Sequence, residues 1–239
     1  MTHSTISTHS LSVGYDRRQV VGNMTFDLVP GNLMVLIGTN GSGKSTLLKT
    51  LAGMLAPISG SVSLLGHKPG ALPARVAFLP QHPVSSHTLP LRAEDVVGMG
   101  RFAHLGLIKR STQADRIIVD ESMLRTGVND FAKLPLRLLS GGQQQRTHLA
   151  QVLARRAEVL LLDEPTAGLD VNGRGAVANL ISQERSRGVT VVLATHEISD
   201  ADNANIVMLL AQRVVAVGPP LDVLRDDYLR ECFGFTQPH

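Results

Sequence analysis

The chain has 239 residues, 43% of them hydrophobic, which is enough for one large domain or two small ones around a sizeable core. The formal charge of +3 is only mildly basic and the arginines are scattered, so the composition argues against a nucleic-acid surface. The single cysteine excludes an internal disulfide, the start of the chain has no apolar signal core, and no apolar run approaches the roughly 18 residues of a membrane span. We therefore expect a globular protein of a reducing cytosol.

The N-terminal part of the chain is predicted to be a loose start followed by antiparallel strands. Residues 1–9 are polar, and we interpret their histidines, His3 and His9, as surface residues rather than metal ligands. Apolar residues partly alternate between residues 10 and 29, which predicts antiparallel strands with one buried face. Residues 33–37 are continuously apolar and predict a fully buried strand.

A glycine-rich segment, residues 38–45, follows the buried strand and precedes a helix-like stretch at 46–52. Its sequence fits the pattern G-x-x-x-x-G-K-[ST], which predicts a loop whose backbone N–H groups surround a polyphosphate. The start of the helix also favours an anion. Lys44 is expected to contact the β and γ phosphates and Ser45 to bind magnesium. The residues expected to bind nucleotide here are Gly38, Asn40, Gly41, Ser42, Gly43, Lys44, Ser45 and Thr46.

The remaining elements follow in an order that is typical of an α/β fold. A hairpin is predicted within residues 53–66 and a strand at 76–79. Helices are then predicted at 92–99, 112–125, 128–132, 144–156 and 173–187. Strand signals return at 159–162, 189–193, 206–210 and 214–217. The alternation predicts a mainly parallel, doubly wound sheet in a single domain of residues 1–239, with a helical subdomain of about residues 90–145 inserted in it.

Two carboxylates, Asp163 and Glu164, come directly after the apolar strand at 159–162. They are therefore expected at the C-terminal edge of the sheet, where α/β proteins bind ligands. In a chain with a phosphate loop, Asp163 would orient Mg²⁺ together with Ser45. Glu164 would act as a general base or polarise water.

A second glycine-rich helix start occurs at Leu139-Ser-Gly-Gly-Gln143 and has no lysine beside it. Taken alone, the segment is interpreted as an ordinary helix cap with Ser140 at the N-cap. One chain with two anion-binding helix starts and a single loop lysine suggests, however, that the second start serves the nucleotide of another molecule.

This second segment resembles the signature of the ABC (ATP-binding cassette) ATPases, and further motifs of that family occur in the family's order across nearly the whole chain. The matching positions are Tyr15 for stacking on adenine, Gln81 for the Q-loop, Gly168–Asp170 for the D-loop and His196 for the switch histidine. Thr39, Gly168 and the pair Arg156-Ala157 depart from the commoner wording of the family, but none of them removes a reacting group.

The resemblance implies a P-loop NTPase core with a mainly parallel sheet, an N-terminal antiparallel β subdomain and a helical subdomain that contains the signature. It also implies ATP and Mg²⁺ as cofactors. The catalytic residues would be Lys44, Glu164 and His196, the metal ligands Ser45, Gln81 and Asp163, and the further nucleotide contacts Tyr15, Ser140, Gly141, Gly142, Gln143 and Asp170. The partners would be a second copy or a paired ATPase subunit, integral-membrane permease subunits and, indirectly, an extracytoplasmic solute-binding protein, with the chain held on the cytoplasmic face of the membrane.

The cargo is expected to be a divalent metal, zinc or manganese. The segment from Gln81 to Arg110 resembles that of bacterial zinc and manganese importer ATPases. Importers of iron chelates, haem or cobalamin share the core from Gly100 to Gly106 but usually have proline at the position of Ala103. Histidines also occur in this segment, where the family's ATPase meets its permease, and we do not expect them to bind metal. They are His82, His87 and His104.

Two alternatives to a transport function are a soluble ABC ATPase that acts on nucleic acid or ribosomes, and a regulatory module that does not hydrolyse ATP. The chain has one cassette and no long coiled coil, which argues against the first. Glu164 and His196 are both intact, which argues against the second.

Overall fold

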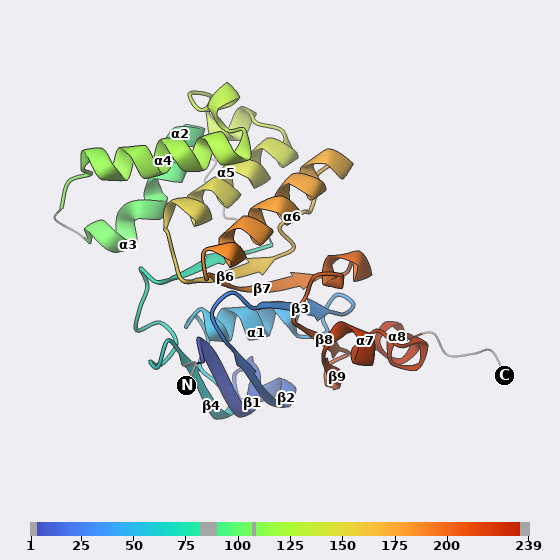
Figure 1. Cartoon of the computed structure of the whole chain (residues 1–239). Coiled ribbons are helices and arrows are strands. Elements are labelled where there is room, and N and C mark those ends of the chain that lie inside the picture. The colour runs from blue at the N-terminus through green and yellow to red at the C-terminus, as the bar shows by residue number, and fades with distance from the viewer. Residues whose placement is uncertain (1–3, 82–89, 107–108, 235–239) are drawn as a thin grey trace.

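Two β-sheets and two groups of helices make up the computed structural model, which describes residues 4–81, 90–106 and 109–234 (Figure 1). Helix α1 (Lys44–Leu51) lies between the smaller and the larger sheet, and α6 (Val171–Ser186) lies on the opposite face of the larger sheet (Figure 1). Each face of the larger sheet has its own set of buried side chains. The larger sheet is therefore covered on both sides, as its continuously apolar strands predict.

The smaller sheet contains β1 (Ile6–Tyr15), β2 (Arg18–Leu28) and β4 (Ser59–Leu64) in the order β2-β1-β4, with antiparallel pairs. It confirms the antiparallel strands expected between residues 10 and 29. The prediction of a loose start is wrong from Ile6 onward, because this fully buried residue pairs with both neighbouring strands. The prediction of a hairpin within residues 53–66 is also wrong, because β4 pairs with the distant β1.

The larger sheet has the order β5-β6-β7-β3-β8-β9. Its strands are β5 (Val76–Leu79), β6 (Val159–Asp163), β7 (Thr190–Thr195), β3 (Leu33–Ile37), β8 (Ile206–Leu210) and β9 (Val214–Gly218). All its pairs are parallel except β8 with β9. The parallel strands β3, β6 and β7 therefore end at one edge, which brings the phosphate loop, the paired carboxylates and the histidine after β7 together.

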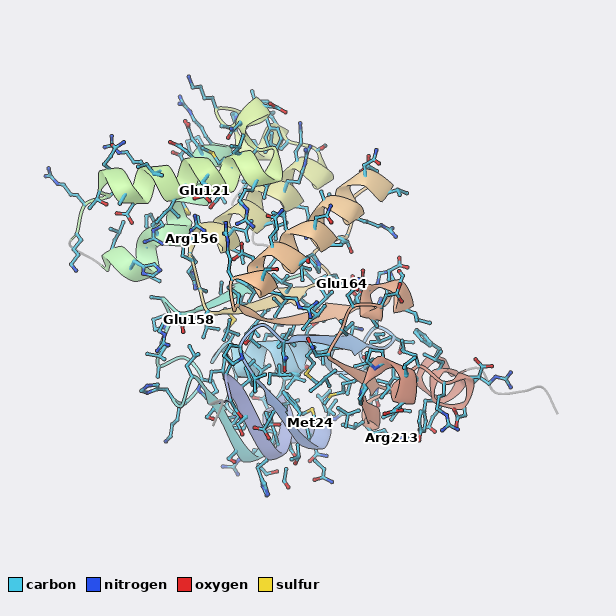
Figure 2. All side chains as sticks on the ribbon, in the orientation of Figure 1. Met24, Glu121, Arg156, Glu158, Glu164 and Arg213 are labelled. Carbon is cyan, nitrogen blue, oxygen red and sulfur yellow. The ribbon has the colours of Figure 1, made fainter. Side chains whose placement is uncertain are left out.

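The helical subdomain comprises α2 (Ala93–Gly98), α3 (Phe102–Leu105), α4 (Gln113–Thr126) and α5 (Gly141–Ala154). Single 3-10 turns at Met99–Arg101, Asn129–Phe131 and Leu136–Leu138 connect them, the second within the helix expected at 128–132. Helix α5 joins this subdomain to the larger sheet, because Ala150 packs with the other helices while Leu149 packs with the sheet core. An ion pair also joins Glu121 of α4 to Arg156, which follows the end of α5 (Figure 2).

The C-terminal elements α7 (Pro220–Val223) and α8 (Asp226–Phe233) pack against the larger sheet, and the sequence analysis did not predict either helix. A 3-10 turn at Ile198–Ala201 follows β7. Among the described residues, no helix has both the length and the hydropathy needed to cross a membrane.

Candidate functional site

The loop between β3 and α1 forms the floor of a cavity of about 370 Å³, which we call the phosphate cavity. Residues from three places in the sequence line it: Asn40, Gly41, Ser42, Gly43, Lys44, Ser45, Thr46, Gln81 and Glu164. The structure thus brings the loop, the Q-loop glutamine and the second carboxylate to one site. Gly38 lies at the base of the loop and is not among the lining residues.

The backbone of this loop requires glycine at two positions. Gly43 has φ 109°, and a Cβ there would lie 2.2 Å from a methyl group of Val21. A Cβ on Gly38 would lie 2.2 Å from the carbonyl oxygen of Leu210. The hydroxyl of Ser42 is buried and has no hydrogen-bond partner. A hollow of backbone N–H groups at a helix start, together with an unsatisfied hydroxyl, fits the oxygens of a polyphosphate.

Lys44 supplies the positive charge of the cavity. Its Nζ donates to the carbonyl oxygens of Gly38 at 2.6 Å and Thr39 at 3.0 Å. Burial lowers the pKa of Lys44, while the nearby carboxylates of Glu164 and Asp163 oppose that shift. The positive charge that an anion in the cavity would contact is therefore already stabilised by these two carboxylates.

Asp163 ends β6 and is buried beside α1. Burial raises the pKa of its carboxyl group, whereas a hydrogen bond from Ser45 lowers it. A carboxylate and a hydroxyl side by side, next to a phosphate cavity, are the oxygen donors that Mg²⁺ takes in such sites. The two residues therefore fit the predicted metal, and their role as ligands stays a prediction.

Neighbouring side chains contact both the carboxylate and the backbone of Glu164. Gln81 Nε2 donates to its Oε2 at 2.9 Å, and His196 Nδ1 lies 3.6 Å from its Oε1. Its backbone takes φ 49°, and Gln145 of α5 donates to the carbonyl oxygens that follow β6. Gln145 was not among the predicted site residues, because three consecutive glutamines at 143–145 carry no signal of which one points inward.

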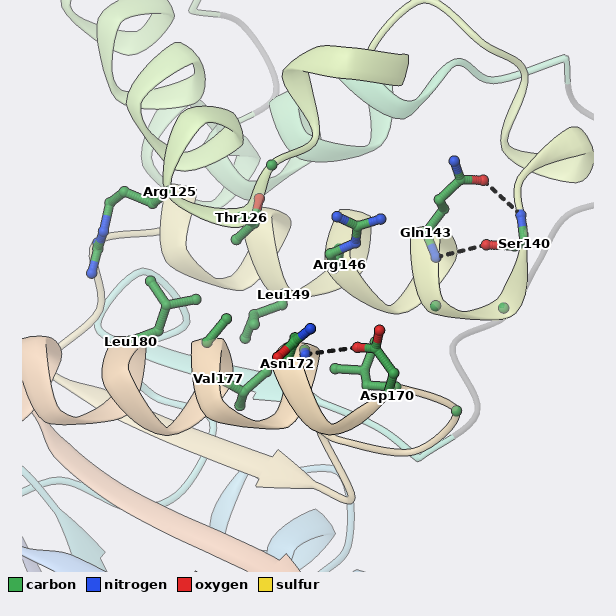
Figure 3. Close-up of a pocket in the computed structure, with 17 residues that line it drawn as sticks. Arg125, Thr126, Ser140, Gln143, Arg146, Leu149, Asp170, Asn172, Val177 and Leu180 are labelled. Carbon is green, nitrogen blue, oxygen red and sulfur yellow. Dashed lines mark hydrogen bonds between the residues drawn. The ribbon is translucent and has the colours of Figure 1, made fainter.

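The second glycine-rich start begins α5 as predicted, with Ser140 at the N-cap. Ser140 Oγ accepts a hydrogen bond from the backbone N–H of Gln143 at 3.3 Å, and Gln143 Oε1 accepts one from the N–H of Ser140 at 2.9 Å. Asp170 caps α6 in a similar way by accepting from the N–H of Gly173 at 2.8 Å. These caps flank a cavity of about 750 Å³ between α5 and α6, which we call the signature cavity (Figure 3).

The phosphate cavity and the signature cavity share no lining residue within the described parts of the chain. The residues Ser140, Gly141, Gly142, Gln143 and Asp170 all line the second. One chain alone therefore does not bring its two glycine-rich helix starts to the same cavity, and a role of the second start for the nucleotide of another molecule stays a prediction.

Tyr15 lies elsewhere. It is the last residue of β1, is 42% exposed and lines a separate cavity of about 540 Å³ with Asp16, Arg17 and residues 55–58. The structure does not place it among the residues that line the phosphate cavity, and its stacking on adenine stays a prediction.

The histidines of the segment from Gln81 to Arg110 were not expected to bind metal. His104 Nε2 lies 2.6 Å from the carbonyl oxygen of Arg155, a contact that ties α3 to the end of α5. His82 and His87 lie outside the described residues.

Comparison with known proteins gives concordant results. The sequence model of the family described as ABC transporter matches residues 21–167. The manganese transport system ATP-binding protein MntB of Halalkalibacterium halodurans is 34% identical over 229 residues, which are 95% of this chain and 91% of that protein. The iron(3+)-hydroxamate import ATP-binding protein FhuC of Bacillus subtilis is 33% identical over 238 residues, 96% of this chain and 88% of that protein. A solved structure assigned to the metal-chelate type of ABC transporter superposes with a TM-score of 0.84 at 29% identity, covering 97% of this chain and 90% of that one.

Proposed function

The chain belongs to the ABC transporter family, and on that premise we propose that it is the ATP-hydrolysing subunit of an importer for a divalent metal, manganese or zinc. The observation that supports this cargo is the similarity to manganese transport system ATP-binding proteins over nearly the whole chain. Besides the protein of H. halodurans, the MntB proteins of Bacillus subtilis and Listeria monocytogenes are 33% and 31% identical over 230 and 225 residues.

We propose that the phosphate cavity binds the β and γ phosphates of ATP. Lys44 would exchange the carbonyl oxygens of Gly38 and Thr39 for phosphate oxygens, and Ser42 would find there the partner that it lacks. Ser45, Asp163 and Gln81 would hold Mg²⁺, which when bound neutralises charge on the transferring phosphoryl group. Ser42, Lys44, Ser45 and Gln81 support these assignments because they line the cavity. Asp163 does not line it but is hydrogen-bonded to Ser45.

Glu164 is proposed as the group that takes a proton from the attacking water. It lines the phosphate cavity, and the amide of Gln81 fixes one of its oxygens at 2.9 Å. His196 approaches the other oxygen and would contact the γ phosphate from the β7 side. Base catalysis by a positioned carboxylate typically contributes about 10²–10⁴-fold in rate.

The working unit is proposed to be a head-to-tail pair of subunits. Residues 38–46 of one subunit and Ser140, Gly141 and Gly142 of the other would enclose each ATP. Support comes from the separation of the two cavities within one chain and from the absence of a lysine at the start of α5. Permease subunits would hold this pair at the cytoplasmic face of the membrane, and a solute-binding protein would deliver the cargo on the other side.

A second cargo class has support of the same kind. FhuC of B. subtilis, named above for iron(3+)-hydroxamate import, matches nearly the whole chain, and the chelated iron transport system protein YfeB of Yersinia pestis is 34% identical over 219 residues. YfeB covers 90% of this chain, but only 74% of its own length is matched. Iron chelates are therefore the alternative that the experiment must separate.

The test is ATP hydrolysis by the assembled transporter in proteoliposomes, with its solute-binding protein supplied in turn with manganese, zinc, a ferric hydroxamate and cobalamin. We expect manganese or zinc to stimulate hydrolysis, and a complex built with Glu164→Gln to show no stimulation. Stimulation by the ferric hydroxamate or cobalamin alone would overturn the metal assignment. A complex that hydrolyses ATP but responds to none of the four would contradict it as well.

A further inference from the structure

The side chain of Gln145 links the helix that follows the signature to the backbone of Glu164. Gln145 lies in the second turn of α5 and is buried. Its Nε2 donates to the carbonyl oxygen of Pro165 at 2.9 Å and to that of Glu164 at 3.4 Å. One amide therefore holds two consecutive carbonyl groups immediately after β6.

The backbone held in this way is in a conformation that needs support. Glu164 has φ 49°, in the left-handed region that residues with a Cβ rarely adopt and that persists only when the surroundings impose it. Its N–H donates to the carbonyl oxygen of Ala194 in β7 at 2.9 Å, which fixes one side of the residue. The other side carries the carbonyl group that Gln145 contacts, and it accepts as well from the N–H of Ala167 at 3.1 Å.

The direction of the Glu164 side chain depends on this backbone conformation, because φ and ψ limit which side-chain rotamers are allowed. Its carboxylate must lie within hydrogen-bond reach of a water in the phosphate cavity if it is to accept a proton. Gln81, which follows β5, donates to one oxygen of the carboxylate, and Gln145 of α5 donates to the backbone carbonyl groups after β6.

We propose that Gln145 is a positioning residue for hydrolysis. It keeps Glu164 in its left-handed conformation, so that the direction of the carboxylate depends on the position of the helix that follows Ser140. Gln145 does not line the phosphate cavity and acts only through Glu164. This inference rests on the proposed role of Glu164 as the base.

A purely structural role for Gln145 makes different predictions. An amide that only connects α5 to the sheet would affect folding stability and, through a shifted loop, ATP binding and turnover together. A positioning role predicts a fall in kcat at an unchanged KM for ATP, because the phosphate loop is untouched. It also predicts that the effect disappears when the carboxylate is already absent.

The experiment compares three variants in the assembled transporter. Gln145→Met keeps the length of the side chain without a donor, and Gln145→Asn keeps the amide but cannot reach the carbonyl groups. Gln151→Met is the matched control, because Gln151 is an amide of the same helix whose side chain contacts His148 and not the residues after β6. We expect both changes at residue 145 to lower kcat about 10-fold or more with KM within about twofold of wild type, and Gln151→Met to leave kcat within about twofold.

A second comparison uses the Glu164→Gln background, in which residual single-turnover hydrolysis is measured with and without Gln145→Met. We expect less than a twofold further loss there, since the carboxylate that Gln145 positions is gone. A kcat of wild-type size in both variants at residue 145 would overturn the proposal, as would an equal loss in the Glu164→Gln background. A wild-type complex without ATPase activity would instead refute the proposed function.

Discussion

Replacing Lys44 by alanine removes the one cation among the described residues that line the phosphate cavity. In the structure its Nζ donates to two backbone carbonyl oxygens of the phosphate loop. When ATP binds, the ammonium group must exchange these neutral acceptors for phosphate oxygens. We therefore count the net gain of a single charge-assisted hydrogen bond, about 1.5–3 kcal/mol. The variant should bind ATP roughly 10- to 150-fold more weakly.

The melting temperature offers a direct readout of that loss. At an ATP concentration 100 times the wild-type Kd, binding stabilises the folded state by about 2.7 kcal/mol. A chain of this size gains roughly 2–4 °C in Tm per kcal/mol, so the wild-type protein should melt about 5–11 °C higher with ATP. A variant with a 100-fold higher Kd would gain only about 0.4 kcal/mol, or roughly 1–2 °C.

Loss of folding is not expected to obscure the result. Burial lowers the pKa of Lys44, so the charged lysine is disfavoured in the folded state without nucleotide. Alanine removes the cost of burying this charge but also removes the hydrogen bonds to Gly38 and Thr39, so the two effects on folding stability oppose each other. Lys49→Ala, in the same helix but outside the cavity, is the control. An ATP affinity of Lys44→Ala within twofold of wild type, or an equal loss in Lys49→Ala, would show that Lys44 does not contact the phosphates.

Three further predictions concern His196, Tyr15 and the buried carboxylate of Asp115. His196→Ala should keep the affinity for ATP but lower kcat in the assembled transporter by about 10²-fold, and an unchanged kcat would contradict its role. Tyr15→Phe should bind ATP nearly normally and Tyr15→Ala about 1–3 kcal/mol more weakly, whereas equal affinities in all three proteins would remove Tyr15 from the site. Hydrogen bonds from Thr112 and from Arg101 lower the pKa of Asp115 from 3.8 to about 2. The ionised carboxylate of Asp115 therefore stabilises the folded state fully above about pH 4, and this stabilisation is lost as the pH falls toward 2. In urea titrations, the difference in free energy of unfolding between wild type and Asp115→Asn should be constant from pH 7 to 5 and smaller at pH 3.

Much of the fold, and the proximity of the site residues to one another, could be predicted from the sequence, because the strongest sequence patterns are local. A continuously apolar strand, a glycine-rich loop and a helix start are adjacent in the chain, and β3, the phosphate loop and α1 form as their order predicts. The carboxylates Asp163 and Glu164 follow a parallel strand, whose end must lie at the same edge as that of β3. Topology then determines their proximity.

The start of β1 was not predictable from polarity. Thr8 is polar yet buried, because its hydroxyl donates to the carbonyl oxygen of Phe26 and accepts from the N–H of the same residue. Those partners lie 18 residues away in β2, beyond any local pattern. The same holds for β4, whose apolar residues suggested a hairpin although the strand pairs with β1.

The direction of one functional side chain also depends on tertiary contacts. The direction of Gln145 is set by how α5 crosses the end of β6, and three glutamines in a row hide that choice. The C-terminal helix α8 is short and carries charges on one face, while Cys232 on the other face is buried against the sheet. Its apolar residues Tyr228, Leu229, Cys232 and Phe233 do recur with a helical period, so this helix could have been predicted from the sequence.

In the proposed dimer, the phosphate cavity of one subunit and the signature segment of another together enclose ATP. The most direct measurement is the mass of the Glu164→Gln protein in solution, with and without ATP and Mg²⁺, by gel filtration with light scattering. The amide preserves the shape of the side chain but cannot accept a proton, so bound ATP should persist. We expect a species of 25.6 kDa without ATP and of twice that mass with ATP, and no dimer when Ser140→Arg is added to the same chain. A Glu164→Gln protein that binds ATP and remains at 25.6 kDa would contradict this expectation.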